Sequence, residues 1–142
     1  LYRQNHRVKF KTPFEFVVSA LRAGGAEVED GNAAEYLLER MGQPTYRCVD
    51  PTGYDDRAEA WLDPGVLLHR WGFALALAHD DLDGVHVPEH AQAKTSPDAL
   101  FNPLTRDMVS EQTRNEADAA LRRGGPAAAR AVVLGSPEFQ QQ

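Results

Sequence analysis

The side chains best suited to chemistry gather in one short polar stretch. In chain order they are His79, Asp80, Asp81, Asp83, His86 and His90. The histidine spacing, H-x6-H-x3-H on an expected loop, matches no closed zinc pattern, and a proline separates the last two histidines. We therefore interpret the stretch as a solvated acidic loop, with a hard-cation contact by its carboxylates as the alternative. No metal ligand is predicted.

Arg70 is the most conspicuous ionisable residue, because it lies in an otherwise apolar segment. Between Gly65 and Ala78 only His69 and Arg70 are strongly polar. A buried guanidinium must find a carboxylate or carbonyl oxygens. A guanidinium near the surface extends instead to solvent. We favour a structural ion pair for Arg70 over ligand binding.

The sequence lacks the common signatures of nucleophilic catalysis and phosphate binding. It contains no G-x-S-x-G, no H-E-x-x-H and no phosphate-cradling glycine loop. Cys48 is the single cysteine, so no internal disulfide can form. Without a nucleophile signature around it, we interpret Cys48 as a packed or idle thiol. No catalytic residue and no cofactor is predicted.

Length and charge limit the classes of protein. A chain of 142 residues is one domain or part of a larger one. The net charge of −6 disfavours generic nucleic-acid binding, and no apolar run approaches the ~20 residues of a membrane-spanning helix. Residues 1–11 carry +4 and the rest −10. We interpret this basic segment as solvated, with docking onto an acidic partner or onto the acidic body of the same protein as the alternative.

The elements that must position these residues are predicted to be helices. Thr12 and Pro13 begin the first helix, and Gly24 and Gly25 end it. Its apolar residues Phe14, Val17, Val18 and Leu21 recur on one face. A second amphipathic helix begins near residue 32 and forms an antiparallel pair with the first. Ser110 caps a fourth helix with Ala117, Ala120 and Leu121 inside, and a fifth covers 127–134, with Phe139 as an anchor beyond it.

The third helix, predicted from Asp63 to about His79, is apolar nearly all round. Such a helix is expected in the buried core of a larger folded protein. Gly72 in the helix interior lowers helix stability by about 1 kcal/mol relative to Ala. We therefore expect another backbone to cross the helix closely at Gly72. We therefore expect neighbouring protein structure outside this chain to complete the cover of the helix.

The fold class predicted is all-α, with about five helices and long irregular loops, as the C-terminal portion of a larger helical domain. The whole chain is treated as one helical region. Its parts are a basic entry segment (1–11), a helix pair (12–42), an aromatic and proline-rich loop (43–62), a central buried helix (63–79), a polar loop (80–110) and C-terminal helices (111–142).

Five phrases in fixed order carry a family resemblance. They are FKTPFEFVVSALR (10–22), MGQP (41–44), PTGY (51–54), Trp61 followed by LLHRWGFA (67–74), and LGSPEFQ (134–140). The ordered set resembles the C-terminal part of the bacterial domain of unknown function 1800 family (DUF 1800), over nearly the whole chain. Where family members commonly have Trp after the turn glycine, this sequence has Tyr54, which keeps a large aromatic side chain.

The resemblance implies a largely helical protein of several hundred residues, in many cases exported, whose gene often lies beside that of another exported protein. It brings no reaction, so no catalytic residue is carried over. We expect a structural, protein-interaction module, with an enzyme wall shared with an N-terminal portion as the alternative. The expected partner is that N-terminal portion or a neighbouring exported protein. The candidate binding residues are Tyr54, Trp61, Arg70 and Trp71.

Overall fold

The structure is a computed structural model that describes residues 10–41, 43, 64–101 and 109–141. This part of the chain forms helices and one two-stranded sheet. The helices are α1 (Pro13–Ala23), α2 (Asn32–Arg40), α3 (Pro64–Ala78), α4 (Glu89–Gln92), α5 (Pro97–Leu100), α6 (Glu111–Gly124) and α7 (Pro126–Leu134), and the strands are β1 (Glu27–Val28) and β2 (Val85–His86). The all-α prediction is confirmed: the five longer helices are the expected ones, and α4 and α5 add one turn each.

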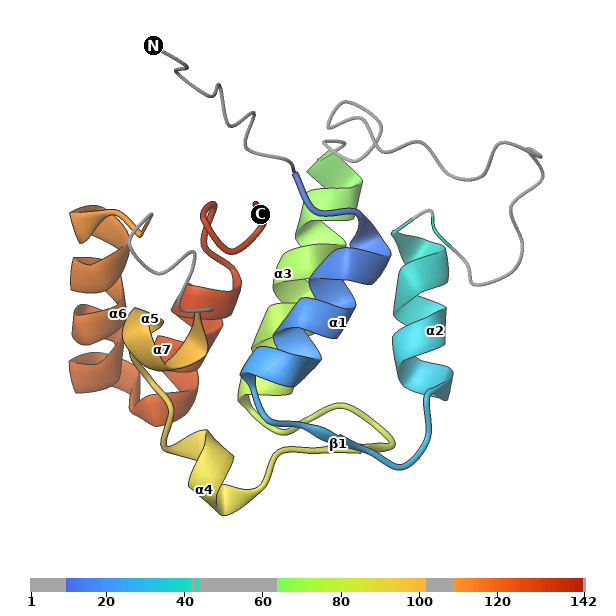
Figure 1. The fold of residues 1–142 in the computed structure, drawn as a ribbon, viewed down its shortest axis with the longest axis horizontal. Helices are drawn as coiled ribbons and strands as arrows, with labels where there is room; N and C mark the ends of the chain where they lie inside the picture. The colour runs from blue at the N-terminus through green and yellow to red at the C-terminus, as the bar shows by residue number, and fades with distance from the viewer. Residues whose placement is uncertain (1–9, 42, 44–63, 102–108, 142) are drawn as a thin grey trace, which may run out of the picture.

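The helices form two groups that meet at α3 (Figure 1). On one side α1 and α2 run antiparallel beside α3, and on the other side α7 lies between α3 and α6. The two strands pair antiparallel, with Glu27 opposite His86 and Val28 opposite Val85. This short ladder ties the α1–α2 connection to the loop that follows α3, so the C-terminal end of α3 is fixed to the α1–α2 group.

The first helix begins and ends as its sequence predicts. The Thr12 hydroxyl accepts a hydrogen bond from the Glu15 backbone N–H, and the Glu15 carboxylate accepts one from the Thr12 N–H, which completes a capping box. At the other end Gly25 has φ +63°, a conformation that glycine adopts without strain. A Cβ at Gly25 would lie 2.9 Å from the Cβ of Ala91, so this glycine also allows α4 to approach.

The buried face of α1 differs from the expected one. The buried residues are Pro13, Phe16, Val17 and Ala20, whereas Phe14 is half exposed. Both sets recur at i, i+3, i+4 and i+7, one residue apart, so periodicity alone could not choose between them. Phe16 decides the orientation, because its ring packs edge-to-face against Phe73 and Phe139 with centroids 5.9 and 6.2 Å away.

Two further expectations are corrected. Within 80–110, the predicted polar loop contains β2, α4 and α5 and places Val85, Val87 and Leu100 in the core. Leu121 was expected inside and is 40% exposed on α6. Short apolar runs between prolines gave no periodic signal, so the core contribution of this segment was missed. Phe139 is buried and confirmed as an anchor.

No helix in the described ranges has both the length and the apolar character needed to cross a membrane.

Candidate functional site

Helix α3 carries candidate site residues on two different faces. One face is buried and contains Arg70, Phe73, Ala74, Leu77 and Ala78. The other face is exposed. Because both groups pack on α3, its backbone fixes where the side chains of both faces begin.

The Arg70 guanidinium is fully buried, with no exposed area. Its Nη1 donates to the Gln140 side-chain oxygen at 3.0 Å, and its Nη2 donates to the Lys11 carbonyl oxygen at 2.7 Å. The rings of Phe10 and Phe16 lie 4.8 and 5.3 Å from its central carbon. Arg70 thus joins α3 to both ends of the described chain, which also pair through the Lys11 N–H and the Gln140 carbonyl at 2.7 Å.

Lys11 is a second buried cation beside Arg70. Its ammonium lies 4.1 Å from the centroid of the Phe139 ring. Burial is the main cause that lowers the pKa of Lys11 to about 8, with Glu15 opposing this change and Arg70 adding to it. Burial likewise lowers the pKa of Arg70 to about 10, against an opposing contribution from Glu15. The fold therefore holds two cations where charge is disfavoured.

The ion pair expected for Arg70 does not occur among the described residues. Arg70 is bound by an amide oxygen, a backbone carbonyl and two aromatic faces, so the carbonyl alternative is the one observed. The expectation that residues 1–11 form a solvated segment is wrong for Lys11, which is only 9% exposed. Tyr54 and Trp61 lie outside the described residues, so their candidate roles stay predictions.

Trp71 belongs to an exposed apolar stripe on the other face of α3. Leu68, Trp71 and Leu75 follow one another at helical spacing and are 65%, 52% and 54% exposed. Gly72 lies in the same stripe, and no described atom lies within 4 Å of the position a Cβ would take. The close backbone crossing suggested for Gly72 is therefore not made by the described chain. The described residues leave this face of α3 open.

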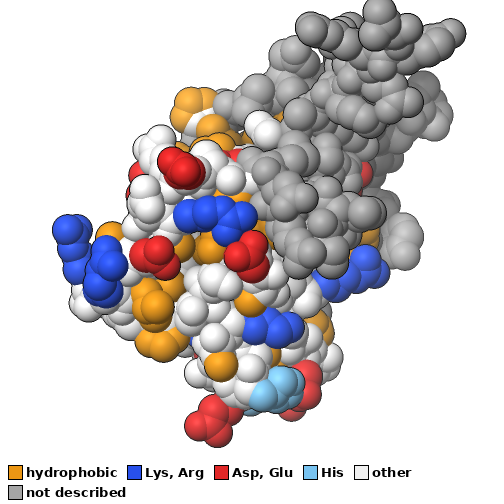
Figure 2. Space-filling model, turned by 60° about the vertical axis from the view of Figure 1, so that its left-hand side comes forward, with side chains coloured by type: hydrophobic (Ala, Val, Ile, Leu, Met, Phe, Trp, Pro, Cys, Tyr) orange, Lys and Arg blue, Asp and Glu red, His pale blue; other side chains and the backbone are white. Residues whose placement is uncertain are grey.

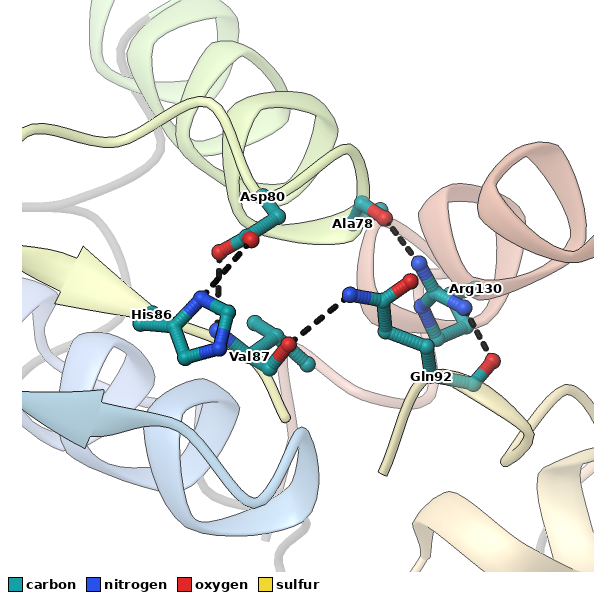
Figure 3. A network of polar contacts seen from close by, with 6 residues as sticks. All are labelled: Ala78, Asp80, His86, Val87, Gln92 and Arg130. Carbon is teal, nitrogen blue, oxygen red and sulfur yellow. Dashed lines mark hydrogen bonds and ion pairs between the residues drawn. The ribbon is translucent and has the colours of Figure 1, made fainter. Parts of the chain in front are cut away.

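The polar stretch after α3 forms a structural network rather than a histidine cluster (Figure 3). The Asp80 carboxylate accepts hydrogen bonds from the Val87 N–H at 2.7 Å and pairs with the His86 ring at 2.9 Å. Asp80 itself has φ +53°. Arg130 on α7 donates to the carbonyl oxygens of Ala78 and Gln92. Together these bonds fix the end of α3 to β2, α4 and α7.

The histidines show no metal-binding arrangement in the described ranges. No group of three or more His, Cys, Asp or Glu residues there could hold a metal ion. His86 is exposed and joined to Asp80 alone among the acids of the stretch.

The face that carries α5 and α6 has mixed character. Figure 2 shows acidic and basic side chains interspersed over it, with hydrophobic side chains in separate patches. Arg114 on α6 pairs with Asp98 on α5 at 3.2 Å, and both side chains reach solvent. This view shows no extended field of one sign.

Glu138 organises the start of α6. Its carboxylate accepts hydrogen bonds from the Ser110 hydroxyl at 2.6 Å, from the Ser110 N–H at 3.1 Å and from the Thr113 hydroxyl at 2.9 Å. Burial raises the pKa of Glu138, but the hydrogen bonds from Ser110 and Thr113 outweigh it and hold the pKa below its usual value. The C-terminal segment is thus bound to α6 through an ionised carboxylate.

Sequence reasoning missed Gln140, Arg130 and Glu138. Arg130 is the single charge in an Ala- and Val-rich helix, the same signal that made Arg70 conspicuous. Gln140 and Glu138 lie in a short polar tail with no signal of burial, since their partners are 70 and 25 to 28 residues away in the chain.

Comparison with known proteins identifies the chain by family. No curated protein and no solved structure matches it. A family model described as a protein of unknown function, DUF1800, matches residues 1–141, which is essentially the whole chain. The match agrees with the ordered phrases, several of which now have a structural role in capping α1, in α3 and around Phe139. The chain belongs to the DUF1800 family.

Proposed function

We propose that this chain is a structural, protein-interaction module whose exposed α3 stripe packs against a helix of another protein segment. The single observation that carries the proposal is the stripe of Leu68, Trp71 and Leu75, each more than half exposed on a helix whose opposite face is fully packed. Large apolar side chains placed together on one exposed face mark interaction sites more often than isolated ones do.

The chemistry of the stripe indicates a helical partner. Leucine and tryptophan at i, i+3 and i+7 match the anchor pattern of helices that pack in apolar grooves. Gly72 between them gives the surface a low point at which another backbone can approach closely. A tryptophan near the centre of such a patch supplies the large buried area that binding hot spots use.

We propose the N-terminal portion of the same protein as the occupant of this face. The resemblance to proteins of several hundred residues supports this choice, as does the apolar character of α3 all round. Export from a bacterial cell is proposed on the resemblance alone. A neighbouring exported protein is the alternative partner, and a second copy of the chain is the occupant that the experiment below distinguishes from the N-terminal portion.

Charged substitutions in the stripe test the proposal. Leu68→Glu and Leu75→Glu place a charge on an exposed surface, so they should leave the melting temperature of the chain within a few degrees of wild type. Each should weaken binding to the separately expressed N-terminal portion at least tenfold in calorimetry, because a buried unpaired carboxylate is costly. Leu121→Glu on α6 is the matched control, at an exposed leucine outside the stripe.

Two results would reject the proposal. Equal binding by wild type and both stripe variants would show that the stripe is not the contact. Concentration-dependent self-association of wild type, abolished by Leu75→Glu, would assign the face to a second copy of the chain instead.

An enzyme wall is the second candidate function, and one observation favours it. The exposed His86 ring is oriented by the Asp80 carboxylate at 2.9 Å, as a general base is oriented in many enzymes. If the pair is catalytic, His86→Ala should abolish turnover by the longer protein without lowering its melting temperature. An unchanged rate would leave the pair with its structural role only.

A further inference from the structure

The Trp71 side chain lies against the end of α7 and does not project freely from α3. Its indole Cδ1 is 3.5 Å from the position that a Cβ on Gly135 would take, which is ordinary van der Waals contact. Helix α7 packs against α3, and Gly135 is the residue that ends α7. The Trp71 side chain is nevertheless 52% exposed. One part of the indole therefore contacts α7, and the rest is open to a partner.

The backbone of Gly135 does not itself require a glycine. Its φ is −89°, so no positive-φ conformation favours this residue type here. Its N–H donates to the Ala131 carbonyl oxygen at 3.0 Å, as expected at a helix end. The atoms around the missing Cβ are this carbonyl oxygen, at 3.1 Å, and the Trp71 ring. A side chain longer than that of alanine would compete with the indole for the same space.

A ring that is held in place is a better binding anchor than one that changes rotamers freely. Ordering a free side chain opposes binding, and a side chain that is already ordered avoids this cost. Trp71 lies between Leu68 and Leu75 in the exposed α3 stripe. Contact with α7 therefore fixes the largest side chain at the centre of that surface.

We propose that Gly135 is a positioning residue of the α3 stripe, because it leaves room for the Trp71 indole to lie against α7 in the orientation that the partner helix binds. This inference rests on the docking proposed above, with the N-terminal portion as the occupant. Two of the ordered phrases, LLHRWGFA (67–74) and LGSPEFQ (134–140), thus meet at one point of the docking surface. The surface is made by α3 together with the end of α7.

The first test measures the surroundings of Trp71 in the free 142-residue chain. In a Trp61→Phe background Trp71 is the single tryptophan, so the fluorescence reports on this ring alone. Gly135→Ile places two γ carbons beside the ring, and few rotamers leave the ring where it is. The emission should shift to longer wavelength, and quenching by acrylamide should increase.

Gly31→Ile is the matched control for this substitution. Gly31 also lies at a helix end with a negative φ, but no described atom lies within 4 Å of the position of its Cβ. This variant should leave the emission and the quenching of Trp71 as they are in the Trp61→Phe chain.

The second test is a double-mutant cycle for binding to the separately expressed N-terminal portion. Gly135→Ile should weaken binding at least fivefold in calorimetry, and Gly135→Ala, which adds only a Cβ, should weaken it less. In a Trp71→Ala background Gly135→Ile should have no further effect, because the residue acts through the indole. If Gly135→Ile melts below the temperature of the titration, the same cycle is measured with Gly135→Ala.

The outcomes separate this inference from the docking itself. If Leu75→Glu weakens binding but Gly135→Ile costs the same affinity with and without Trp71, the stripe docks and the role of Gly135 is overturned. Equal emission and quenching of Trp71 before and after Gly135→Ile would overturn it as well. If Leu68→Glu and Leu75→Glu both bind as wild type does, the docking is rejected and this inference falls with it.

Discussion

Arg70 and Arg130 are both buried guanidinium groups, yet they differ in how completely their donors are used. Arg130 donates to the carbonyl oxygens of Ala78 and Gln92 and so caps the C-terminal end of α3. Arg70 leaves its Nε without a described acceptor. Two backbone acceptors give Arg130 a structural role, whereas a buried donor without an acceptor among the described residues is unusual in a folded protein.

Arg130→Met should destabilise the chain strongly. The substitution keeps a long apolar stem but leaves the buried Ala78 carbonyl and the part-buried Gln92 carbonyl without this donor, so the free energy of unfolding should fall by about 2–4 kcal/mol. Urea denaturation measures this change. Arg122→Met on the exposed surface of α6 is the control and should change the free energy of unfolding by less than about 0.5 kcal/mol. Equal effects of the two substitutions would show that the Arg130 bonds contribute nothing.

Glu138 should make stability depend on acid pH. Its pKa in the folded state lies below the 4.5 of a free glutamate, so between the two values the unfolded chain binds more protons. The stabilisation is therefore complete above about pH 4.5 and is lost as the pH falls through the folded pKa. Denaturation across pH 2–6 should show a shallower loss for Glu138→Gln than for wild type. Glu89→Gln, at an exposed carboxylate, should follow the wild-type profile.

Residues with a local signal could be predicted, and residues with distant partners could not. Arg70 was found because a charge in an apolar helix is unusual in composition alone. Its acceptor Gln140 is 70 positions away in the chain, and no pattern in the sequence links the two. Lys11 looked like part of a basic surface segment, because burial of a lysine is decided by packing rather than by neighbouring residues.

At the scale of elements, helix ends were predictable and helix faces were not always so. The cap at Thr12 and the stop at Gly25 depend on side-chain and backbone chemistry within a few residues, which the sequence contains in full. The buried face of α1 depends on which of two apolar stripes meets Phe73 and Phe139. That choice is made by distant aromatic residues and was wrong in the sequence-based prediction.

Gly72→Ala should separate stability from interaction. The position is in the interior of α3 with open space around it, so alanine should stabilise the isolated chain by about 1 kcal/mol. If another backbone approaches Gly72 in the complex, the same methyl group should weaken binding to the N-terminal portion. Thermal denaturation of the chain and calorimetry of the complex measure the two effects. A variant that is more stable and binds equally well would show that no backbone approaches Gly72.

At the scale of the whole molecule, α3 is central to the described fold but is not closed by it. Four phenyl rings, those of Phe16, Phe73, Phe101 and Phe139, form a connected cluster on its buried side. Leu68, Trp71 and Leu75 on the opposite side remain exposed among the described residues. The sequence predicted a helix that needs cover on all sides, and the described fold provides that cover on one side.

The most direct test of whether protein outside this chain covers α3 is the accessibility of the α3 stripe in the longer protein. Leu75→Cys in a Cys48→Ser background should react rapidly with a maleimide in the 142-residue chain and at least tenfold more slowly in the protein that includes the N-terminal portion. Asn115→Cys, on the exposed surface of α6, should react at the same rate in both. Equal rates at position 75 in the two proteins would contradict the claim that protein outside this chain covers α3.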